Sequence, residues 1–337
     1  MIDPPTPRKL SLCMIVRNEE RWLPGCLKSI DGVVDEVVVV DTGSTDLSVE
    51  IATHFGARVI PHMWIDDFSD ARNVSLEAAT GDWIMVLDAD EELSAQSKTN
   101  IHEVISADEV DGVEMIIRSE LPSTDVAAYE ETRIIRLFRN RREYRYQMPI
   151  HEQIRPAIEE KKGKIVASDL TIIHHGYAHI SVQQGSIRAD RNLRILFKAL
   201  ESSPRDPYIH YQLGSTLMSI GRRQEAMLEF EKALSLDTEK LGAVVLDKLY
   251  LKMSQIFLER NEYCRAVEFA KESLKCNPLN AISGYVAAIA CLSTNRIAEG
   301  YGYLIRVRDN PKDSLRLRSQ LSELIAACEK VLGGPNS

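Results

Sequence analysis

Residues 79–93 read ATGDWIMVLDADEEL, and this stretch is the strongest indication of the fold of the first half of the chain. Its apolar run, Trp83–Leu87, has the composition of a buried strand and leads directly into Asp88-Ala89-Asp90. Two carboxylates at the carboxyl end of a buried strand offer hard oxygen ligands to a divalent cation that also binds phosphate. A solvated turn is the alternative, because D-x-D is a short pattern in a chain with 50 acidic residues.

Strand and helix patterns alternate before this stretch. Strands that are apolar on both faces and alternate with helices form parallel βαβ units. We therefore expect an α/β fold in which helices cover both faces of a mostly parallel sheet. The sequence predicts strands over Leu10–Val16, Glu36–Val40 and Ala57–Pro61, and helices over Glu19–Ile30, Asp46–Phe55 and Ser69–Ala79.

Polar residues follow each predicted strand, where sheets of this kind bind their ligands. The chain has neither G-x-G-x-x-G after the first strand nor G-x-x-x-x-G-K-[ST], so neither a dinucleotide-binding Rossmann unit nor a P-loop is supported. Acidic strand ends can hold a pyrophosphate through a bridging metal ion, and can accept hydrogen bonds from a ribose or a base. The four strand ends are Arg17-Asn18-Glu19, Asp41-Thr42-Gly43-Ser44-Thr45-Asp46, Asp66-Asp67 and Asp88-Ala89-Asp90.

Several motifs in order carry a family resemblance. The runs LSLCMIVRNEERWLPGCLKSI, DEVVVVDTGSTDLSVEIATHFGA and DDFSDARNVSLEAATGDWIMVLDADEEL resemble the family 2 glycosyltransferases of the GT-A fold, in particular bacterial members fused to tetratricopeptide repeats. The resemblance continues more sparsely through IHEQI and IIHHGY. It implies a GT-A type sheet and the transfer of a sugar from a nucleoside diphosphate donor.

The resemblance also implies roles for the strand-end residues. Asp41 would hold the nucleoside, with Glu19 lining the same pocket; capping of the next helix is the alternative role of Asp41. Asp90 would bind Mn²⁺ or Mg²⁺ directly, and Asp88 would hold the ribose or complete the metal site. Arg72, in the first turn of the helix predicted over 69–79, would pair with a phosphate or buttress an acidic ligand, or else form a surface ion pair.

Arginines are concentrated in residues 132–147, TRIIRLFRNRREYRYQ. The first half of this segment, Thr132–Arg139, is a predicted strand that follows another predicted strand over Asp111–Ile117. The favoured interpretation is a solvated edge strand that its charges keep from pairing, and the alternative is a site for a diphosphate or an anionic acceptor. Glu91 and Glu92 are interpreted as solvated charges at a helix entry.

Two later segments complete the predicted site. The resemblance places an acceptor-facing carboxylate at Glu152, and an inverting transfer needs one base that takes the acceptor proton, so Glu152 is the candidate base. A salt bridge with Arg155 or a neighbouring arginine is the alternative. The apolar strand over 170–173 ends in His174-His175-Gly176-Tyr177. The resemblance places the His of His-x-Gly-Tyr near the pyrophosphate, where His174 would be a third metal ligand or a phosphate donor.

The second half of the chain is predicted to be all-α. A tetratricopeptide pattern fits Pro207–Lys240, a second fits Asp247–Asn280 with Met253-Ser254 in place of Leu-Gly, and a degenerate third begins at Ala281. We expect a glycosyltransferase domain over 1–180, and over 181–337 a linking helix, about three tetratricopeptide repeats and a capping helix. Such arrays offer a concave face to an extended peptide or to another subunit.

Composition limits the classes of function. Residues 1–180 carry 19 Lys and Arg against 32 Asp and Glu, and residues 181–337 carry 22 against 18, so an acidic first half makes bulk nucleic-acid binding improbable. The six cysteines form no C-x-x-C pattern, which is typical of a reducing compartment. No signal peptide or transmembrane segment is predicted, and the cytoplasm is the expected location.

These observations predict a metal-dependent, inverting glycosyltransferase that uses a nucleotide sugar, with a UDP-sugar favoured. The acceptor is either a protein or peptide recruited by the repeats, or an envelope or lipid-linked saccharide, in which case the repeats would form a homodimer. A catalytically inactive repeat scaffold is the alternative from a different class.

Overall fold

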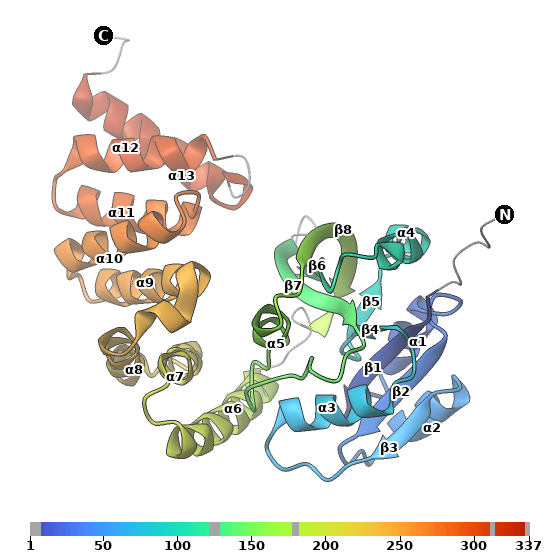
Figure 1. Cartoon of the computed structure of the whole chain (residues 1–337). Coiled ribbons are helices and arrows are strands. Elements are labelled where there is room, and N and C mark those ends of the chain that lie inside the picture. Colours follow the sequence, from blue (N-terminus) through green and yellow to red (C-terminus); the bar gives the residue numbers. More distant parts are fainter. Residues whose placement is uncertain (1–7, 121–128, 177–181, 311–313, 334–337) are drawn as a thin grey trace. The chain divides into compact units, whose positions relative to one another are not determined.

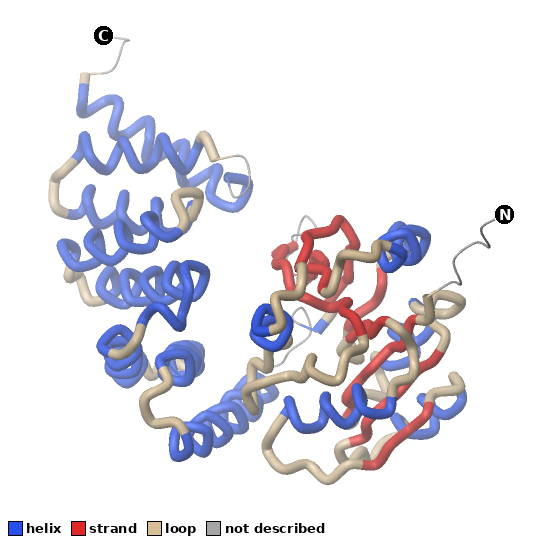
Figure 2. The backbone as a smooth tube through the Cα atoms, viewed as in Figure 1, coloured by secondary structure: helices blue, strands red, loops and turns tan. Residues whose placement is uncertain are grey.

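The computed structural model describes residues 8–120, 129–176, 182–310 and 314–333 (Figure 1). The chain divides into two compact units, residues 1–185 and 186–337. Among the described residues, every strand belongs to the first unit, and the second unit is helical (Figure 2). Tyr177, which completes the predicted His-x-Gly-Tyr pattern, lies outside the described residues.

A mixed sheet forms the first unit, with the described strands in the order β3-β2-β1-β4-β7-β6-β8-β5. Strands β1 to β4 pair in parallel, as the βαβ pattern predicts, and β6 pairs in parallel with β8. Strand β7 runs antiparallel to both of its neighbours, and β5 runs antiparallel to β8. The strands are β1 Leu10–Val16, β2 Glu36–Asp41, β3 Arg58–Pro61, β4 Trp83–Val86, β5 Glu91–Leu93, β6 Gly112–Glu120, β7 Tyr129–Arg139 and β8 Ile165–His174.

Helices cover both faces of this sheet because successive side chains of a strand point to opposite faces. Leu12 and Met14 of β1 pack in one core with residues of α1, α2 and α4, whereas Cys13 packs in the other core with Leu76 of α3 and Ile158 of α5. The predicted two-sided coverage is therefore confirmed. The helices are α1 Leu23–Ser29, α2 Ser48–His54, α3 Phe68–Ala78, α4 Ala95–Ser106 and α5 Arg155–Glu160.

The interpretation of the arginine-rich strand as a solvated edge strand is wrong. Strand β7 lies between β4 and β6, and the side chain of Arg136 is buried, with 9% of the residue exposed. Trp83 pairs with Arg139 and Met85 with Leu137, so the next step of this register brings Arg136 level with the end of β4. A cation is therefore placed beside the Asp88-Ala89-Asp90 turn.

The second unit is a stack of antiparallel helix pairs. Gly214 of α7 lies against Phe230 of α8 so closely that a Cβ atom on residue 214 would stand 2.6 Å from the phenyl ring, which explains the glycine of the first repeat. In the second repeat, Met253 and Ser254 are fully buried at the corresponding positions. The described helices are α6 Val182–Ser202, α7 Pro207–Ser219, α8 Arg223–Ser235, α9 Gly242–Glu259, α10 Tyr263–Cys276, α11 Ala281–Ser293, α12 Ile297–Arg308 and α13 Ser314–Leu332.

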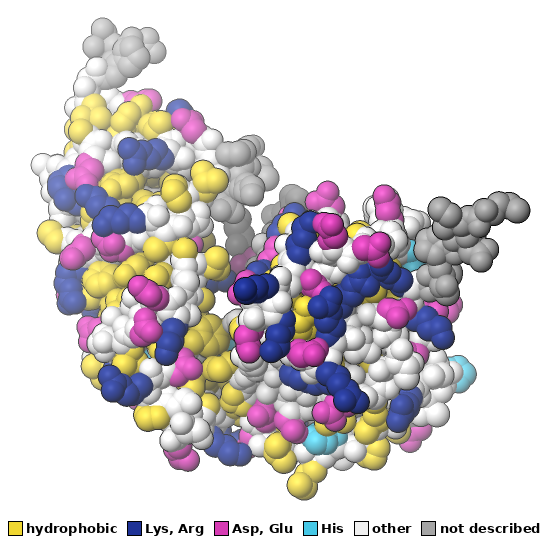
Figure 3. Space-filling view, in the orientation of Figure 1, with side chains coloured by type: hydrophobic (Ala, Val, Ile, Leu, Met, Phe, Trp, Pro, Cys, Tyr) yellow, Lys and Arg dark blue, Asp and Glu magenta, His cyan; other side chains and the backbone are white. Residues whose placement is uncertain are grey.

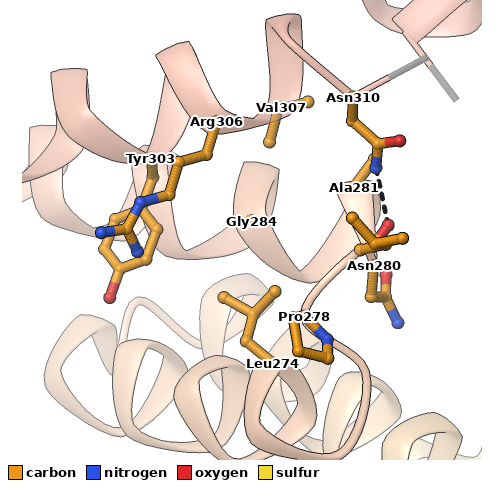
Figure 4. Close-up of a pocket in the computed structure, with 10 residues that line it drawn as sticks. Leu274, Pro278, Asn280, Ala281, Gly284, Tyr303, Arg306, Val307 and Asn310 are labelled. Atoms are coloured by element: carbon orange, nitrogen blue, oxygen red, sulfur yellow. Dashed lines mark hydrogen bonds between the residues drawn. The ribbon is translucent and has the colours of Figure 1, made fainter. Parts of the chain in front are cut away.

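Helices α10, α11 and α12 and the segments that follow α10 and α12 line a small pocket of about 130 Å³ (Figure 4). Leu274 and Pro278 line one side and Tyr303 and Arg306 line the other, while the Asn310 amide donates a hydrogen bond of 2.7 Å to the Leu279 carbonyl. On the face seen in Figure 3, hydrophobic side chains lie exposed among charged ones over this unit. Within the described residues, we find no helix with the length and apolar character that crossing a membrane requires.

Candidate active site

The Asp88-Ala89-Asp90 turn is fixed by the strands on either side of it. The backbone N–H of Glu91 donates to the carbonyl of Asp88 (3.0 Å), which closes the turn. Glu91 then pairs with His174 across β5 and β8, and the N–H of His175 donates to the carbonyl of Asp90 (3.0 Å). The turn and the end of β8 are 86 residues apart in sequence, counting Asp88 to His174, yet they form one edge of the site.

Asp90 and His174 face each other at this edge. Asp90 Oδ2 lies 3.4 Å from His174 Nε2, and each side chain is 17% exposed. Burial lowers the pKa of His174, but the hydrogen bond and the charge of Asp90 outweigh burial and raise it. On its other side, His174 Nδ1 is 3.1 Å from the hydroxyl of Ser119, which helps to orient the ring.

These two side chains fit a divalent cation. A carboxylate oxygen and an imidazole nitrogen are ordinary ligands of Mn²⁺, and such a cation commonly takes its remaining ligands from substrate phosphates and water. The predicted three-ligand set of Asp90, Asp88 and His174 is not assembled, because the described residues contain no cluster of three or more His, Cys, Asp or Glu that could hold a metal. Asp88 is instead held by arginines.

Asp88 lies between two buried guanidinium groups. Its Oδ1 accepts from Arg72 (2.7 Å) and its Oδ2 accepts from Arg136 (2.9 Å). Burial would raise the pKa of Asp88, but the charges of Arg72 and Arg136 hold it far below its usual range. Nη1 of Arg72 and Nε of Arg136 are buried without a hydrogen-bond partner among the described residues.

The interpretation of Glu91 is also wrong. It was expected to be a solvated charge, but only 2% of it is exposed, and it accepts from Arg136 (2.6 Å) and from the backbone N–H of Asp88 (2.9 Å). Burial raises the pKa of Glu91 to about 7, although the charge of Arg136 lowers it in part. The signal for Arg136 was its place as a lone charge between Ile134-Ile135 and Leu137-Phe138.

Glu152 reaches the same cluster from a distant segment. Its carboxylate accepts from Arg72 Nε (2.5 Å), so Arg72 bridges Glu152 and Asp88 rather than pairing with the surface residues Asp66 or Asp70. Glu152 thus forms a salt bridge with Arg72, whereas Arg155, the partner named in the alternative interpretation, pairs with Glu114 and Glu159. The segment is anchored by reciprocal backbone hydrogen bonds of 3.0 Å between Gln147 and Gln153.

The backbone around Glu152 is unusual. Met148 (φ 76°) and His151 (φ 54°) both occupy the left-handed region of backbone conformation, which residues other than glycine seldom adopt. The carbonyl of Pro149 accepts from the N–H of Phe68 at the start of α3 (2.8 Å). Strained backbone of this kind persists where surrounding contacts over-determine it, and it is common at functional sites.

The loops after β1 and β2 interlock beside this cluster. Asn18 accepts from the N–H of Thr45 (2.7 Å), and Glu19 donates its N–H to Ser48 (2.8 Å). The Asp41 carboxylate accepts from the N–H groups of Gly43 (3.2 Å) and Ser44 (3.1 Å) in its own turn. Glu19 and Asp41 thus follow neighbouring strand ends at the same edge of the sheet, and their nucleoside-binding roles stay predictions.

Two sequence-family models match this chain, one in each compact unit. The sequence model described as glycosyl transferase family 2 matches residues 11–157, and a tetratricopeptide repeat model matches residues 207–240. A TPR repeat-containing protein of Synechococcus elongatus is 38% identical over 232 residues, 67% of this chain and 56% of that protein. The prophage-derived glycosyltransferase SunS of Bacillus subtilis is 26% identical over 265 residues, 77% of this chain and 61% of SunS.

The chain therefore spans somewhat more than half the length of the curated relatives it matches. A crystal structure of glucosyl-3-phosphoglycerate synthase from Mycobacterium tuberculosis is 25% identical, covering 33% of this chain and 44% of that chain, with a TM-score of 0.29. Residues 11–157 are a family 2 glycosyltransferase domain, and a tetratricopeptide repeat follows it in the same chain at residues 207–240.

Proposed function

We propose that this protein transfers a sugar, with inversion, from a nucleoside diphosphate sugar to an acceptor and requires a divalent cation. The observation that carries the proposal is the meeting of Asp90 and His174 next to the Asp88–Arg72–Glu152 chain at the carboxyl edge of a family 2 glycosyltransferase domain. This edge brings together two candidate metal ligands, Asp90 and His174, with Arg72 and the two carboxylates that it binds, Asp88 and Glu152.

Asp90 and His174 would hold Mn²⁺ or Mg²⁺, which supplies charge neutralisation for the departing diphosphate. Arg72, which pairs with both Asp88 and Glu152, would add positive charge where the diphosphate charge develops. Asp41 and Glu19 can accept hydrogen bonds from the base and the ribose, because an ionised carboxylate only accepts. A uridine nucleotide is the donor that we favour.

Glu152 would act as the base. As the acceptor nucleophile attacks the anomeric carbon from the face opposite the diphosphate, the proton of the nucleophile passes to a Glu152 oxygen, and the bond to the diphosphate oxygen breaks. Glu152 is 13% exposed, so a bound acceptor can reach it, and the Arg72 contact fixes its orientation. Arg72 thus connects the donor side of the site to the acceptor side.

A protein or peptide is the acceptor class that the helical unit favours. Tetratricopeptide arrays present a concave surface suited to an extended polypeptide. Intact-mass analysis of proteins retained by the chain after reaction with the donor should show a gain of one sugar. No mass gain, together with transfer to an extracted saccharide, would favour the saccharide acceptor instead.

The donor site is tested with purified protein, Mn²⁺ and a panel of nucleotide sugars. We expect hydrolysis or transfer with one donor, and a loss of about a hundredfold or more in Asp90→Asn, because that change removes a charged metal ligand. Asp169→Asn, on the same strand as His174 but fully exposed, is the matched control. Equal turnover by Asp90→Asn would refute the assigned site, and no calorimetric binding of UDP with Mn²⁺ to the wild-type chain would favour an inactive scaffold.

A further inference from the structure

Five charged side chains form one connected chain through the candidate site. Glu91 binds Arg136 (2.6 Å), Arg136 binds Asp88 (2.9 Å), Asp88 binds Arg72 (2.7 Å), and Arg72 binds Glu152 (2.5 Å). They come from β5, β7, the turn between β4 and β5, helix α3 and the 147–153 segment. The site's donor side and acceptor side are therefore joined by ion pairs rather than by neighbouring positions in the sequence.

Three members of this chain are buried, because Glu91, Arg72 and Arg136 are 2%, 6% and 9% exposed, whereas the Asp88 side chain is 38% exposed. Glu91 also accepts the backbone N–H of Asp88, so it holds that residue through the main chain as well as through Arg136. Asp88 is thus fixed at its backbone and at both carboxylate oxygens.

The contact between Arg136 and its two carboxylates has an uncommon form. A single nitrogen, Nη2, contacts both Asp88 Oδ2 and Glu91 Oε1. A lysine ammonium, with three donors on one nitrogen, can make the same pair of contacts, whereas a neutral amide cannot supply the charge. Replacement of Arg136 by lysine can therefore be compared with its replacement by glutamine.

We propose that Arg136 and Glu91 are positioning residues of the transfer reaction: through Asp88 and Arg72 they set the orientation of Glu152. This inference rests on the proposed function. Loss of one partner of a buried ion pair strongly destabilises the folded protein, because the other charge is left uncompensated. Removing Arg136 and Glu91 together limits that cost, because Arg136 leaves with one of its two carboxylate partners and Asp88 keeps its contact with Arg72.

The test uses the full chain and compares the wild type with Arg136→Gln/Glu91→Gln, Arg136→Lys, and the control Arg118→Gln/Glu131→Gln. The control removes an equally charge-balanced pair between β6 and β7, with side chains 40% and 50% exposed. Each variant is checked for folding by circular dichroism. We then measure kcat, the donor KM and the calorimetric binding of UDP with Mn²⁺.

We expect kcat of the double variant to fall about tenfold or more, with the donor KM and the UDP–Mn²⁺ affinity changed by less than about threefold, because 1 Å of misplacement is costly in the chemical step. Arg136→Lys should recover most of kcat, and the control should match the wild type. A folded double variant with wild-type kcat, or one whose only change is a higher donor KM, would overturn the inference alone. Neither turnover nor UDP binding by the wild type would overturn the proposed function and the inference with it.

Discussion

At the scale of single residues, Gly176 decides how closely Asp90 can approach the end of β8. A Cβ atom at residue 176 would stand 2.0 Å from Asp90 Oδ2 and 2.9 Å from His174 Nε2, which is closer than real Cβ contacts. Gly176→Ala should therefore displace the Asp90 carboxylate. We expect the Mn²⁺-dependent affinity for UDP to fall about tenfold or more, as calorimetry would show.

Gly302→Ala is the matched control for that change. No atom lies within 4 Å of the added Cβ, and residue 302 is on a helix of the second unit, where alanine in place of glycine stabilises by up to about 1 kcal/mol. If Gly176→Ala bound UDP and Mn²⁺ as the control does, Asp90 and His174 would not be the metal pair.

The residues of this site differ in how far the sequence could reveal them. Asp41, Asp88 and Asp90 end buried strands, so the strand pattern alone placed them at one edge of the sheet. Arg136 and Glu91 were misjudged because their burial depends on strand order. Only the insertion of β7 between β4 and β6 brings Arg136 to Asp88, and pairing between strands distant in sequence is not encoded in local periodicity.

At the scale of elements, Glu36 joins the start of β2 to β1 and to the turn before β4, at the edge opposite the site. It accepts from the hydroxyl of Ser11 (2.5 Å) and the N–H of Gly81 (3.0 Å), and also from Thr80. Burial raises the pKa of Glu36, but these hydrogen bonds outweigh burial and lower it below 4.5. The stabilisation is therefore present above pH 4.5 and is lost as the pH falls.

Glu36→Gln should lower the free energy of unfolding by about 1 kcal/mol at pH 7, because hydrogen bonds to a charged acceptor are replaced by weaker ones. At about pH 3 the difference in stability should be smaller than at pH 7, because protonation of the wild-type carboxyl removes the charged acceptor. Urea unfolding of both proteins at the two pH values measures the difference. A difference that grew on acidification would contradict the assignment of these hydrogen bonds to an ionised carboxylate.

Helix α3 carries Arg72, so its N-terminus affects the site. Asp67 caps α3 by accepting the N–H of Asp70 (3.0 Å), and Ser94 caps α4 by accepting the N–H of Ser97 (3.3 Å). Asp67→Ala and Ser94→Ala should each destabilise the protein by about 1 kcal/mol. Only Asp67→Ala should also lower kcat, by about fivefold, because it loosens the helix that orients Arg72.

Measurement of kcat and the unfolding midpoint for this pair of variants distinguishes a displacement of Arg72 from a loss of protein stability. Equal kcat values in both variants would mean that fraying at the start of α3 does not reach Arg72. The sequence predicts a helix over Ser69–Ala79, and the structure begins α3 one residue earlier, at Phe68, with Asp67 as its cap. The reason is that Asp66 (φ 63°) turns the chain, so that Asp67 is the residue that enters the helix.

At the scale of the whole molecule, the chain consists of two compact units that differ in how sequence determines them. The repeat pattern fixed the helical unit locally, because each helix pair is built from nearby residues such as Gly214 and Phe230. The sheet depends on distant pairings, such as Glu91 with His174. We therefore expect the two units to unfold in separate calorimetric transitions.

Two perturbations should assign those transitions. UDP with Mn²⁺, at 100 times its dissociation constant, should raise only the transition of residues 1–185, by the equivalent of about 2.7 kcal/mol, because the ligand binds one folded unit. Gly214→Ala should lower only the other transition, by about 1–3 kcal/mol, because its Cβ would stand 2.6 Å from Phe230 and 3.0 Å from the Ala226 carbonyl. A single transition that both perturbations shift would instead show that the two units unfold as one cooperative body, and a ligand-induced shift of the Gly214-sensitive transition alone would place the nucleotide on the helical unit.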